Sequence, residues 1–187
     1  MQAPISAPTE MQEMVRQAVD EYLAEKARQE EARVKKIALI STKGTLDMAY
    51  PPLILATTAA ALGGDSAIFF TFYGLNIIHK QKQTKLQVAP LGNPAMPMPV
   101  PNLLGAIPGM TSLGTSVMRS LFKSHGVASI DDLLEAAVAS GVRLMPCAMT
   151  MEVFGYKSAD FMEGAEAACG AATFLDWASD ADISLLI

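Results

Sequence analysis

The pattern of apolar and polar positions changes character near residue 34. Before it, apolar side chains recur at helical spacing from Met11 and Met14 to Tyr22 and Leu23, and residues 25–36 then carry mostly charges of mixed sign. This pattern predicts an N-terminal helical arm over residues 1–34. The apolar stripe rests either on the chain's own domain or on another subunit.

Residues 35–187 alternate between short apolar runs and longer helical patterns. Strand-like runs occupy residues 36–41, 66–72, 142–145 and 183–187, and helical patterns occupy residues 46–62, 112–124, 129–140 and 158–178. A fifth strand is expected within residues 84–90. Buried strands that alternate with helices indicate a mainly parallel sheet with helices on both faces. We therefore predict one α/β domain over residues 35–187, a three-layer α/β/α sandwich with about five strands.

Composition and charge exclude several classes of protein. Of the 187 residues, 51% are hydrophobic and 18% charged, which provides a sizeable core and excludes disorder throughout. The formal net charge of −5 argues against nucleic acid as a partner. Two cysteines are too few for a disulfide scaffold, and the first residues lack the basic flank and apolar run of a secretory signal. We expect a cytoplasmic protein with reduced thiols.

An unusual apolar segment runs from residue 86 to residue 118 without an acidic or basic side chain. It is long enough to cross a bilayer, but its many prolines and glycines would break a spanning helix. Three interpretations stay open: a subunit interface or core segment, a pocket lid, and peripheral contact with a membrane surface. Together with the nearly uncharged helix 46–62, this segment predicts a homo-oligomer.

The candidate chemistry follows the predicted strands, because ligands of parallel sheets gather beyond the carboxyl ends of the strands. Of the segments 42–45, 73–76 and 146–151, only the third carries a strong nucleophile, Cys147. Free N–H groups of a following helix would stabilise its thiolate, although a packed, unreactive cysteine is the alternative. Cys169 is expected to be structural, on the apolar side of helix 158–178.

Side chains near these strand ends are the candidate walls of a substrate pocket. These residues, with Gly44 contributing its backbone, are Thr42, Lys43, Gly44, Tyr73, Met149 and Thr150. Lys43 either stabilises the Cys147 thiolate or is an ordinary surface lysine. Residues 41–45 lack the full phosphate-loop pattern, and His79 and His125 have no partners at metal-ligand spacing. We expect neither a metal nor another cofactor.

Several motifs together resemble the DsrE/DsrF-like family, in particular the branch found with sulfur-oxidation genes. The resemblance rests on KIALISTKG at 36–44, FTFYG at 70–74, the Met/Pro-rich segment, CAMTM at 147–151 and GAATFL at 170–175. It covers residues 35–187 and leaves the arm unexplained. The resemblance implies a three-layer fold, homo-oligomers and a cysteine that carries sulfane sulfur as a persulfide. Its C-x-M-T-M motif places that role on Cys147.

The resemblance implies a sulfur carrier or sulfurtransferase. The Cys147 thiolate would attack the outer sulfur of a donor persulfide and hold it until an acceptor thiolate removes it. The partners would be donor and acceptor proteins with reactive thiols, such as TusA-like or rhodanese-like carriers. Catalytic turnover and stoichiometric delivery are both open. The alternatives are an oligomeric binding module for a hydrophobic ligand or partner, and a peroxiredoxin-like thiol enzyme.

Overall fold

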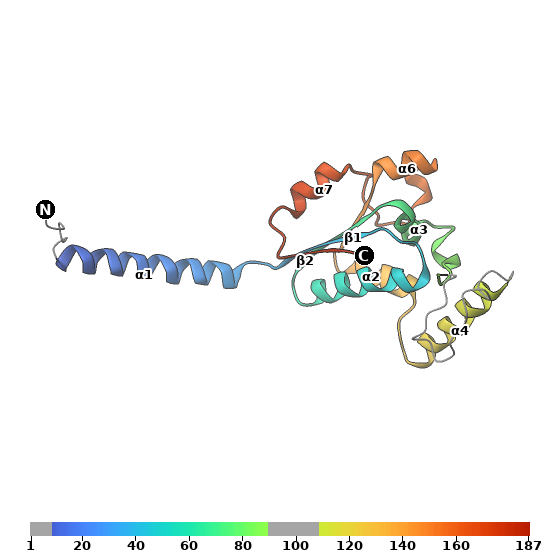
Figure 1. Ribbon diagram of the computed structural model, residues 1–187, viewed down its shortest axis with the longest axis horizontal. Coiled ribbons are helices and arrows are strands. Elements are labelled where there is room, and N and C mark those ends of the chain that lie inside the picture. The colour runs from blue at the N-terminus through green and yellow to red at the C-terminus, as the bar shows by residue number, and fades with distance from the viewer. Residues whose placement is uncertain (1–8, 90–108) are drawn as a thin grey trace, which may run out of the picture. The chain divides into compact units, whose positions relative to one another are not determined.

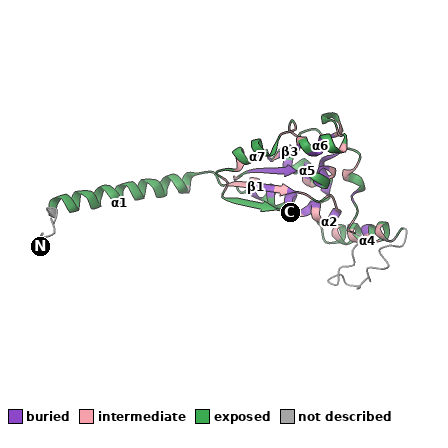
Figure 2. Ribbon diagram, turned by 45° about the horizontal axis from the view of Figure 1, so that its top comes forward, coloured by how far each residue is buried: buried purple, intermediate pink, exposed green. Residues whose placement is uncertain are grey.

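The computed structural model describes residues 9–89 and 109–187, and the chain divides into two units, residues 1–34 and 35–187. In the first unit, helix α1 (Thr9–Ala32) carries the predicted apolar stripe. The described side chains of α1 are exposed, including Met11 at 51% and Tyr22 at 63% (Figure 2). The partner of this stripe stays a prediction.

The second unit is built on a parallel sheet. Its strands are β1 (Lys36–Ser41), β2 (Asp65–Phe70), β3 (Arg143–Pro146) and β4 (Ile183–Leu186). They lie in the order β3-β2-β1-β4, and every neighbouring pair is parallel. The predicted α/β class is confirmed.

The fifth strand expected within residues 84–90 is wrong for the part that the structure describes. A 3-10 turn, η2 (Gln83–Lys85), is followed by an irregular segment up to residue 89. Leu86 is only 3% exposed and packs in the core, and the carbonyl of Gln87 accepts the N–H of Leu46 at 2.9 Å. This segment is therefore held by the buried Leu86 side chain and by a hydrogen bond to the start of α2, and not by pairing with a strand.

Helices cover both faces of the sheet, as the three-layer prediction requires. The helical elements are α2 (Leu46–Ala61), η1 (Phe72–Gly74), α3 (Leu75–Ile78), α4 (Met110–Ser124), α5 (Ile130–Ala139), α6 (Ala148–Phe154), η4 (Ser158–Asp160) and α7 (Ala171–Ala178). Leu39 and Ile68 point into a core shared with α2, α3 and α5, whereas their neighbours Ala38 and Ala67 contact Phe174 of α7 in a second core. Figure 1 shows α2 and α7 on opposite sides of the strands.

The helix predicted over residues 158–178 is mostly absent. Only α7 at its end is α-helical, the 3-10 turn η4 lies at its start, and the residues between them run beside α3 and β3. Met162 donates its N–H to the carbonyl of Ile78, and Glu166 donates to Leu144, each at 2.9 Å. Gly164 has a φ of +92°, in the left-handed region that favours glycine and interrupts a helix. Tertiary hydrogen bonds therefore replace the helical ones.

The interpretations of segment 86–118 stay predictions, because residues 90–108 lie outside the described part. Within the described ranges, no helix has both the length and the apolar character needed to span a bilayer. After the gap, α4 exposes Leu113, Val117 and Leu121, which recur at four-residue spacing along one side.

Candidate functional site

Cys147 lies at the junction between β3 and α6, as the sequence predicted. Its N–H donates to the carbonyl of Phe70 at 2.9 Å, which extends the β2–β3 ladder by one residue. Its backbone is still extended, and Ala148 begins the helix. Only 4% of Cys147 is exposed, and its side chain packs with Met145 and Phe174 on the α7 side of the sheet. The thiol is therefore largely withdrawn from water.

Two hydroxyl groups converge on Cys147 from different elements. Thr150 comes from the first turn of α6 and is 1% exposed, while Thr71 directly follows β2. Their Oγ1 atoms are 3.1 Å apart, and the N–H of Phe72 donates to Thr150 Oγ1 at 3.2 Å. Phe72 has a φ of +48°, a strained conformation for a bulky residue. This hydrogen bond helps to hold that backbone conformation beside the thiol.

Hydrogen bonds acidify the Cys147 thiol. Burial, the largest single influence, raises its pKa, because a charged sulfur is poorly solvated there. The hydroxyl and N–H of Thr150, the hydroxyl of Thr71 and the N–H of Met149 act in the opposite direction and together outweigh burial. The pKa of Cys147 therefore lies below its ordinary value. A lowered pKa increases the thiolate fraction at neutral pH, which is the form that attacks sulfur.

Cys169 lies beside Cys147 rather than on a helix. The two residues form a parallel β-bridge, and Cys169 is partly exposed. Burial, followed by the negative charges of Glu166 and of an ionised Cys147, raises the pKa of Cys169, while Arg143 lowers it in part. The site therefore holds one acidified and one protonated thiol.

The remaining candidate residues lie at varying distances from this centre. The hydroxyl of Thr150 and the N–H of Met149 both contact Cys147. Met149 as a residue is nevertheless 55% exposed. Tyr73 is 64% exposed, and its ring lies 5.7 Å from that of Phe154. Thr150 and Met149 therefore border the thiol, whereas Tyr73 packs against the end of α6.

The loop after β1 is less closely connected to Cys147. The Thr42 hydroxyl donates to the carbonyl of Ile187 at 3.0 Å, which ties it to the C-terminus. Gly44 packs against the backbone of Tyr73 so closely that a Cβ at this position would overlap the Tyr73 carbonyl. Lys43 is exposed and is not among the groups that lower the pKa of Cys147. Gly44 thus joins the two loops, and Lys43 has no described electrostatic role at the thiol.

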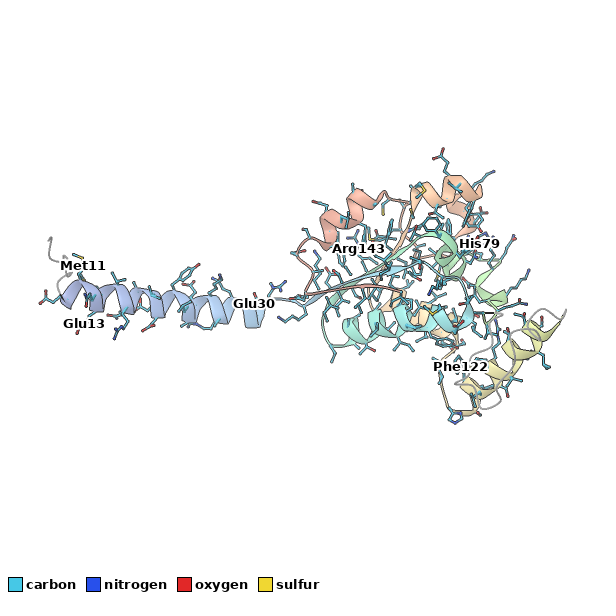
Figure 3. The ribbon with its side chains drawn as sticks, in the orientation of Figure 1. Met11, Glu13, Glu30, His79, Phe122 and Arg143 are labelled. Carbon is cyan, nitrogen blue, oxygen red and sulfur yellow. The ribbon has the colours of Figure 1, made fainter. Side chains whose placement is uncertain are left out.

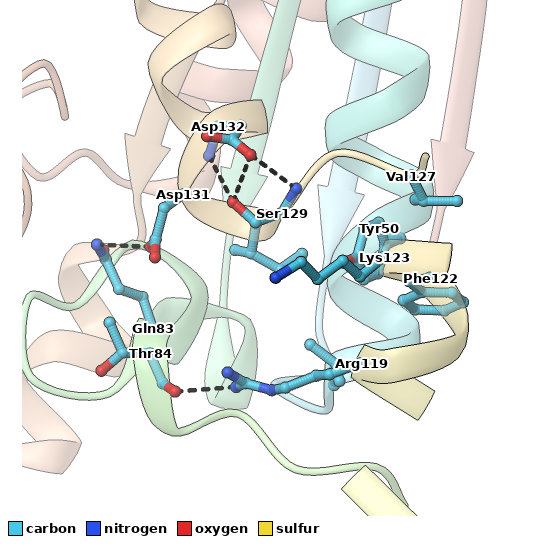
Figure 4. Close-up of a pocket in the computed structure, with 12 residues that line it drawn as sticks. Tyr50, Gln83, Thr84, Arg119, Phe122, Lys123, Val127, Ser129, Asp131 and Asp132 are labelled. Atoms are coloured by element: carbon cyan, nitrogen blue, oxygen red, sulfur yellow. Dashed lines mark hydrogen bonds between the residues drawn. The ribbon is translucent and has the colours of Figure 1, made fainter. Parts of the chain in front are cut away.

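Two cavities open elsewhere on the unit. One of about 320 Å³ lies between α2, α4 and α5, and Figure 4 shows Ser129 and Asp132 in its lining, where they form the capping box of α5. The other, of about 440 Å³, is lined by Gly44, Asn76 and Lys82 among others. Neither lining includes Cys147.

The described residues offer no cluster of histidine, cysteine and carboxylate side chains that would hold a metal ion. His79, labelled in Figure 3, instead packs edge-on against Tyr156 and Phe161, with ring centroids 5.0 and 5.9 Å away. Burial, followed by the charge of Lys82, lowers the pKa of His79. It behaves as a core aromatic residue.

The fold and the site define a class: a three-layer α/β protein with a buried, acidified cysteine at the carboxyl end of its parallel sheet. The chain belongs to the DsrE/DsrF/DrsH-like family, whose family model matches residues 33–186. The resemblance drawn from the motifs is thereby confirmed.

Individual proteins are similar to this chain. Sulfur carrier protein DsrE2 of Allochromatium vinosum is 48% identical over 159 residues, covering 82% of this chain and 98% of that protein. The uncharacterized protein YrkE of Bacillus subtilis is 26% identical over 165 residues, covering 83% and 98% respectively. Among solved structures, the YchN protein from E. coli shares the fold, with a TM-score of 0.50 and 13% identity over 82% of this chain and 100% of that one.

Sequence reasoning missed two residues of the site. The predicted strand 66–72 extends beyond Phe70 and so includes Thr71, although a polar residue directly after the apolar run 66–70 is the sequence signal for the end of the strand. Cys169 was missed because an alanine-rich run at helical spacing looked helical. The flanking Gly164 and Gly170 were the available signal against that helix.

Proposed function

We propose that this protein is a sulfur carrier that holds sulfane sulfur as a persulfide on Cys147 and passes it to a partner thiol. The observation that carries the proposal is the lowered pKa of a buried cysteine surrounded by hydrogen-bond donors. The name of the 48% identical relative, a sulfur carrier protein, supports the same class of function. An unreactive packing cysteine would not need these donors.

The loading step is a thiolate attack on a persulfide. The Cys147 thiolate attacks the outer sulfur of a donor R–S–SH, a bond forms between Sγ and that sulfur, and the donor leaves as a thiolate. Cys147 is then a persulfide, Sγ–SH. In the delivery step, an acceptor thiolate attacks the outer sulfur, and Cys147 leaves as a thiolate. The hydroxyls of Thr150 and Thr71 donate to the negative sulfur before loading and after delivery.

Exposed apolar residues of α6 and of the turn after β2 suit contact with another protein. Phe72 and Tyr73 after β2 are 53% and 64% exposed, and Met149 and Val153 of α6 are 55% and 70% exposed. Met149 and Val153 are four residues apart and so share one side of the helix. Because Cys147 itself is buried, we infer that a donor or acceptor protein packs on these apolar side chains and presents its thiol to Cys147 from this side. TusA-like and rhodanese-like carriers are the proposed partner classes.

We also propose a homo-oligomer and a reducing, cytoplasmic location. The edge strand β4 is exposed along its whole length (Figure 2), and Ile183, Leu185 and Leu186 are apolar. Exposed apolar edge strands recruit another chain, which supports self-association at this edge. Persulfide exchange needs free thiols, and the cytoplasm maintains them.

The test is intact mass spectrometry after incubation with glutathione persulfide. We expect the native chain and Cys169→Ser to gain one sulfur, and Cys147→Ser to gain none. Loading that survives in Cys147→Ser would overturn the assignment. Mild peroxide treatment serves as the comparison: rapid oxidation of Cys147 without any sulfur uptake would instead favour the peroxiredoxin-like alternative.

A further inference from the structure

Cys147 and Cys169 are directly opposed across a short stretch of parallel backbone. The N–H of Cys169 donates to the carbonyl of Pro146, and the N–H of Ala148 donates to the carbonyl of Cys169, each at 2.9 Å. These two bonds bracket Cys147 and define the bridge between the two cysteines. Opposed residues of parallel strands project to the same face. Both cysteines do contact the same core cluster around Phe69 and Phe174.

This placement suits a disulfide. Neighbouring strands lie about 4.7–4.9 Å apart, and disulfides join Cα atoms about 4.4–6.8 Å apart. A bidentate ion pair between Arg143 and Glu166, with N–O distances of 2.6 and 2.9 Å, ties the segment before Cys169 to β3. Cys147 and Cys169 are both free cysteines in the structure, which is the form that the loading step requires.

We propose that Cys169 is the resolving residue of the site: it discharges the Cys147 persulfide as hydrosulfide and leaves a Cys147–Cys169 disulfide. This inference rests on the proposed function, since it needs a persulfide on Cys147. It adds a second fate to the stored sulfur. Sulfur that is not taken by an acceptor thiol leaves as sulfide.

The step balances without an external oxidant. Deprotonated Cys169 attacks the inner sulfur, which is Sγ of Cys147, and an Sγ–Sγ bond forms while the bond to the outer sulfur breaks. The outer sulfur takes the electron pair and leaves as HS⁻, and the proton of Cys169 passes to solvent. The Cys169 sulfur is oxidised and the outer sulfur is reduced. A cellular dithiol or glutathione must then reduce the disulfide before the next cycle.

The surroundings of Cys169 set the rate of this discharge. Burial, Glu166 and the Cys147 charge raise the pKa of Cys169, and Arg143 only partly opposes them. At neutral pH most Cys169 is therefore protonated, and the loaded state persists long enough for an acceptor to take the sulfur. Because the attacking thiolate forms as the pH rises, discharge accelerates toward alkaline pH.

The experiment loads the full chain with glutathione persulfide, removes the donor and follows sulfide release and intact mass. We expect the native chain to release one hydrosulfide per loaded chain and to lose two hydrogens relative to the reduced mass. Cys169→Ser should retain its sulfur at least about tenfold longer, and the control Ala167→Ser should match the native chain. Equal release from native and Cys169→Ser would overturn the inference.

A second measurement separates this inference from the proposed function. Failure of Cys169→Ser to load at all would refute the proposed function. In that case, glutathione disulfide alone tests whether Cys169 resolves a disulfide on Cys147. We expect the native chain to release both glutathiones and close the Cys147–Cys169 disulfide, whereas Cys169→Ser should stop at a mixed disulfide on Cys147. A mixed disulfide that persists in the native chain would contradict a resolving role for Cys169.

Discussion

The Thr150 hydroxyl is the sharpest test of how the site acidifies Cys147. Thr150→Val keeps the shape of a buried, 1% exposed side chain and removes the hydroxyl that helps to lower the pKa of the thiol. Burial of Cys147 is unchanged, so the influence that raises its pKa is less opposed. The N–H of Phe72 also loses its acceptor. We expect the pKa of Cys147 to rise in this variant.

The size of the effect on reactivity follows from the lost hydrogen bond. A hydrogen bond to a charged group contributes about 1.5–3 kcal/mol, so its loss lowers the thiolate fraction at neutral pH by about 13- to 160-fold. The thiolate of a less acidic thiol is intrinsically the better nucleophile, with a Brønsted coefficient of about 0.4–0.5. This gain offsets nearly half of the loss in thiolate fraction on a logarithmic scale. Iodoacetamide labelling of Cys147 should therefore slow by about 4- to 20-fold at neutral pH.

The assay is the labelling rate of the Cys147 peptide measured across pH, read by mass spectrometry. Because both forms are fully ionised at high pH, Thr150→Val should there label at least as fast as the native chain, so that the two profiles cross. Thr150→Ser keeps a hydroxyl and should restore most of the native profile. Thr57→Val is the matched control, since the Thr57 hydroxyl donates within α2 to Leu53 at 2.8 Å. Coincident native and Thr150→Val profiles would refute this account of the acidified thiol.

Three further outcomes are expected. Gly44→Ala should destabilise the fold by about 1–3 kcal/mol in urea unfolding, because the new Cβ overlaps a carbonyl of the loop after β2. Gly114→Ala in α4 is the control, since its Cβ meets only ordinary contacts. Equal stabilities of the two variants would contradict the tight packing of the loops after β1 and β2. Leu185→Lys on the edge strand should lower the mass found by light scattering, and a native mass near 19.9 kDa would refute self-association. Glu166→Gln removes a charge that raises the pKa of Cys169 and should speed alkylation of the Cys169 peptide at neutral pH; an unchanged rate would show that this charge has no influence.

Local sequence was sufficient for the first half of the fold and for the position of Cys147. The runs 36–41 and 65–70 are apolar and bounded by turn residues, so the strand period is visible without tertiary information. Pro146 ends a strand, and a polar–apolar helical pattern follows it. This placed Cys147 at the carboxyl end of the sheet.

The second half of the site depends on contacts that sequence spacing does not contain. Residues 158–170 have helical periodicity, but the N–H groups of Met162, Glu166 and Cys169 donate to carbonyls of α3 and β3, and Gly164 adopts a left-handed conformation. In the structure, Cys169 is therefore a neighbour of Cys147, whereas the helical periodicity predicts a core residue on a helix. Likewise, the Thr71 hydroxyl reaches Thr150 only because β2 and β3 are adjacent in the sheet, although they are far apart in the chain.

The most direct test of the central claim follows one sulfur atom through the protein. Cys169→Ser is loaded with a persulfide whose outer sulfur carries a heavy isotope, freed of donor, and then mixed with an acceptor protein that has one reactive thiol. Peptide mass spectrometry should find the heavy sulfur on the Cys147 peptide before mixing and on the acceptor thiol afterwards. Heavy sulfur that never appears on Cys147, or that reaches the acceptor equally well from Cys147→Ser, would contradict the account.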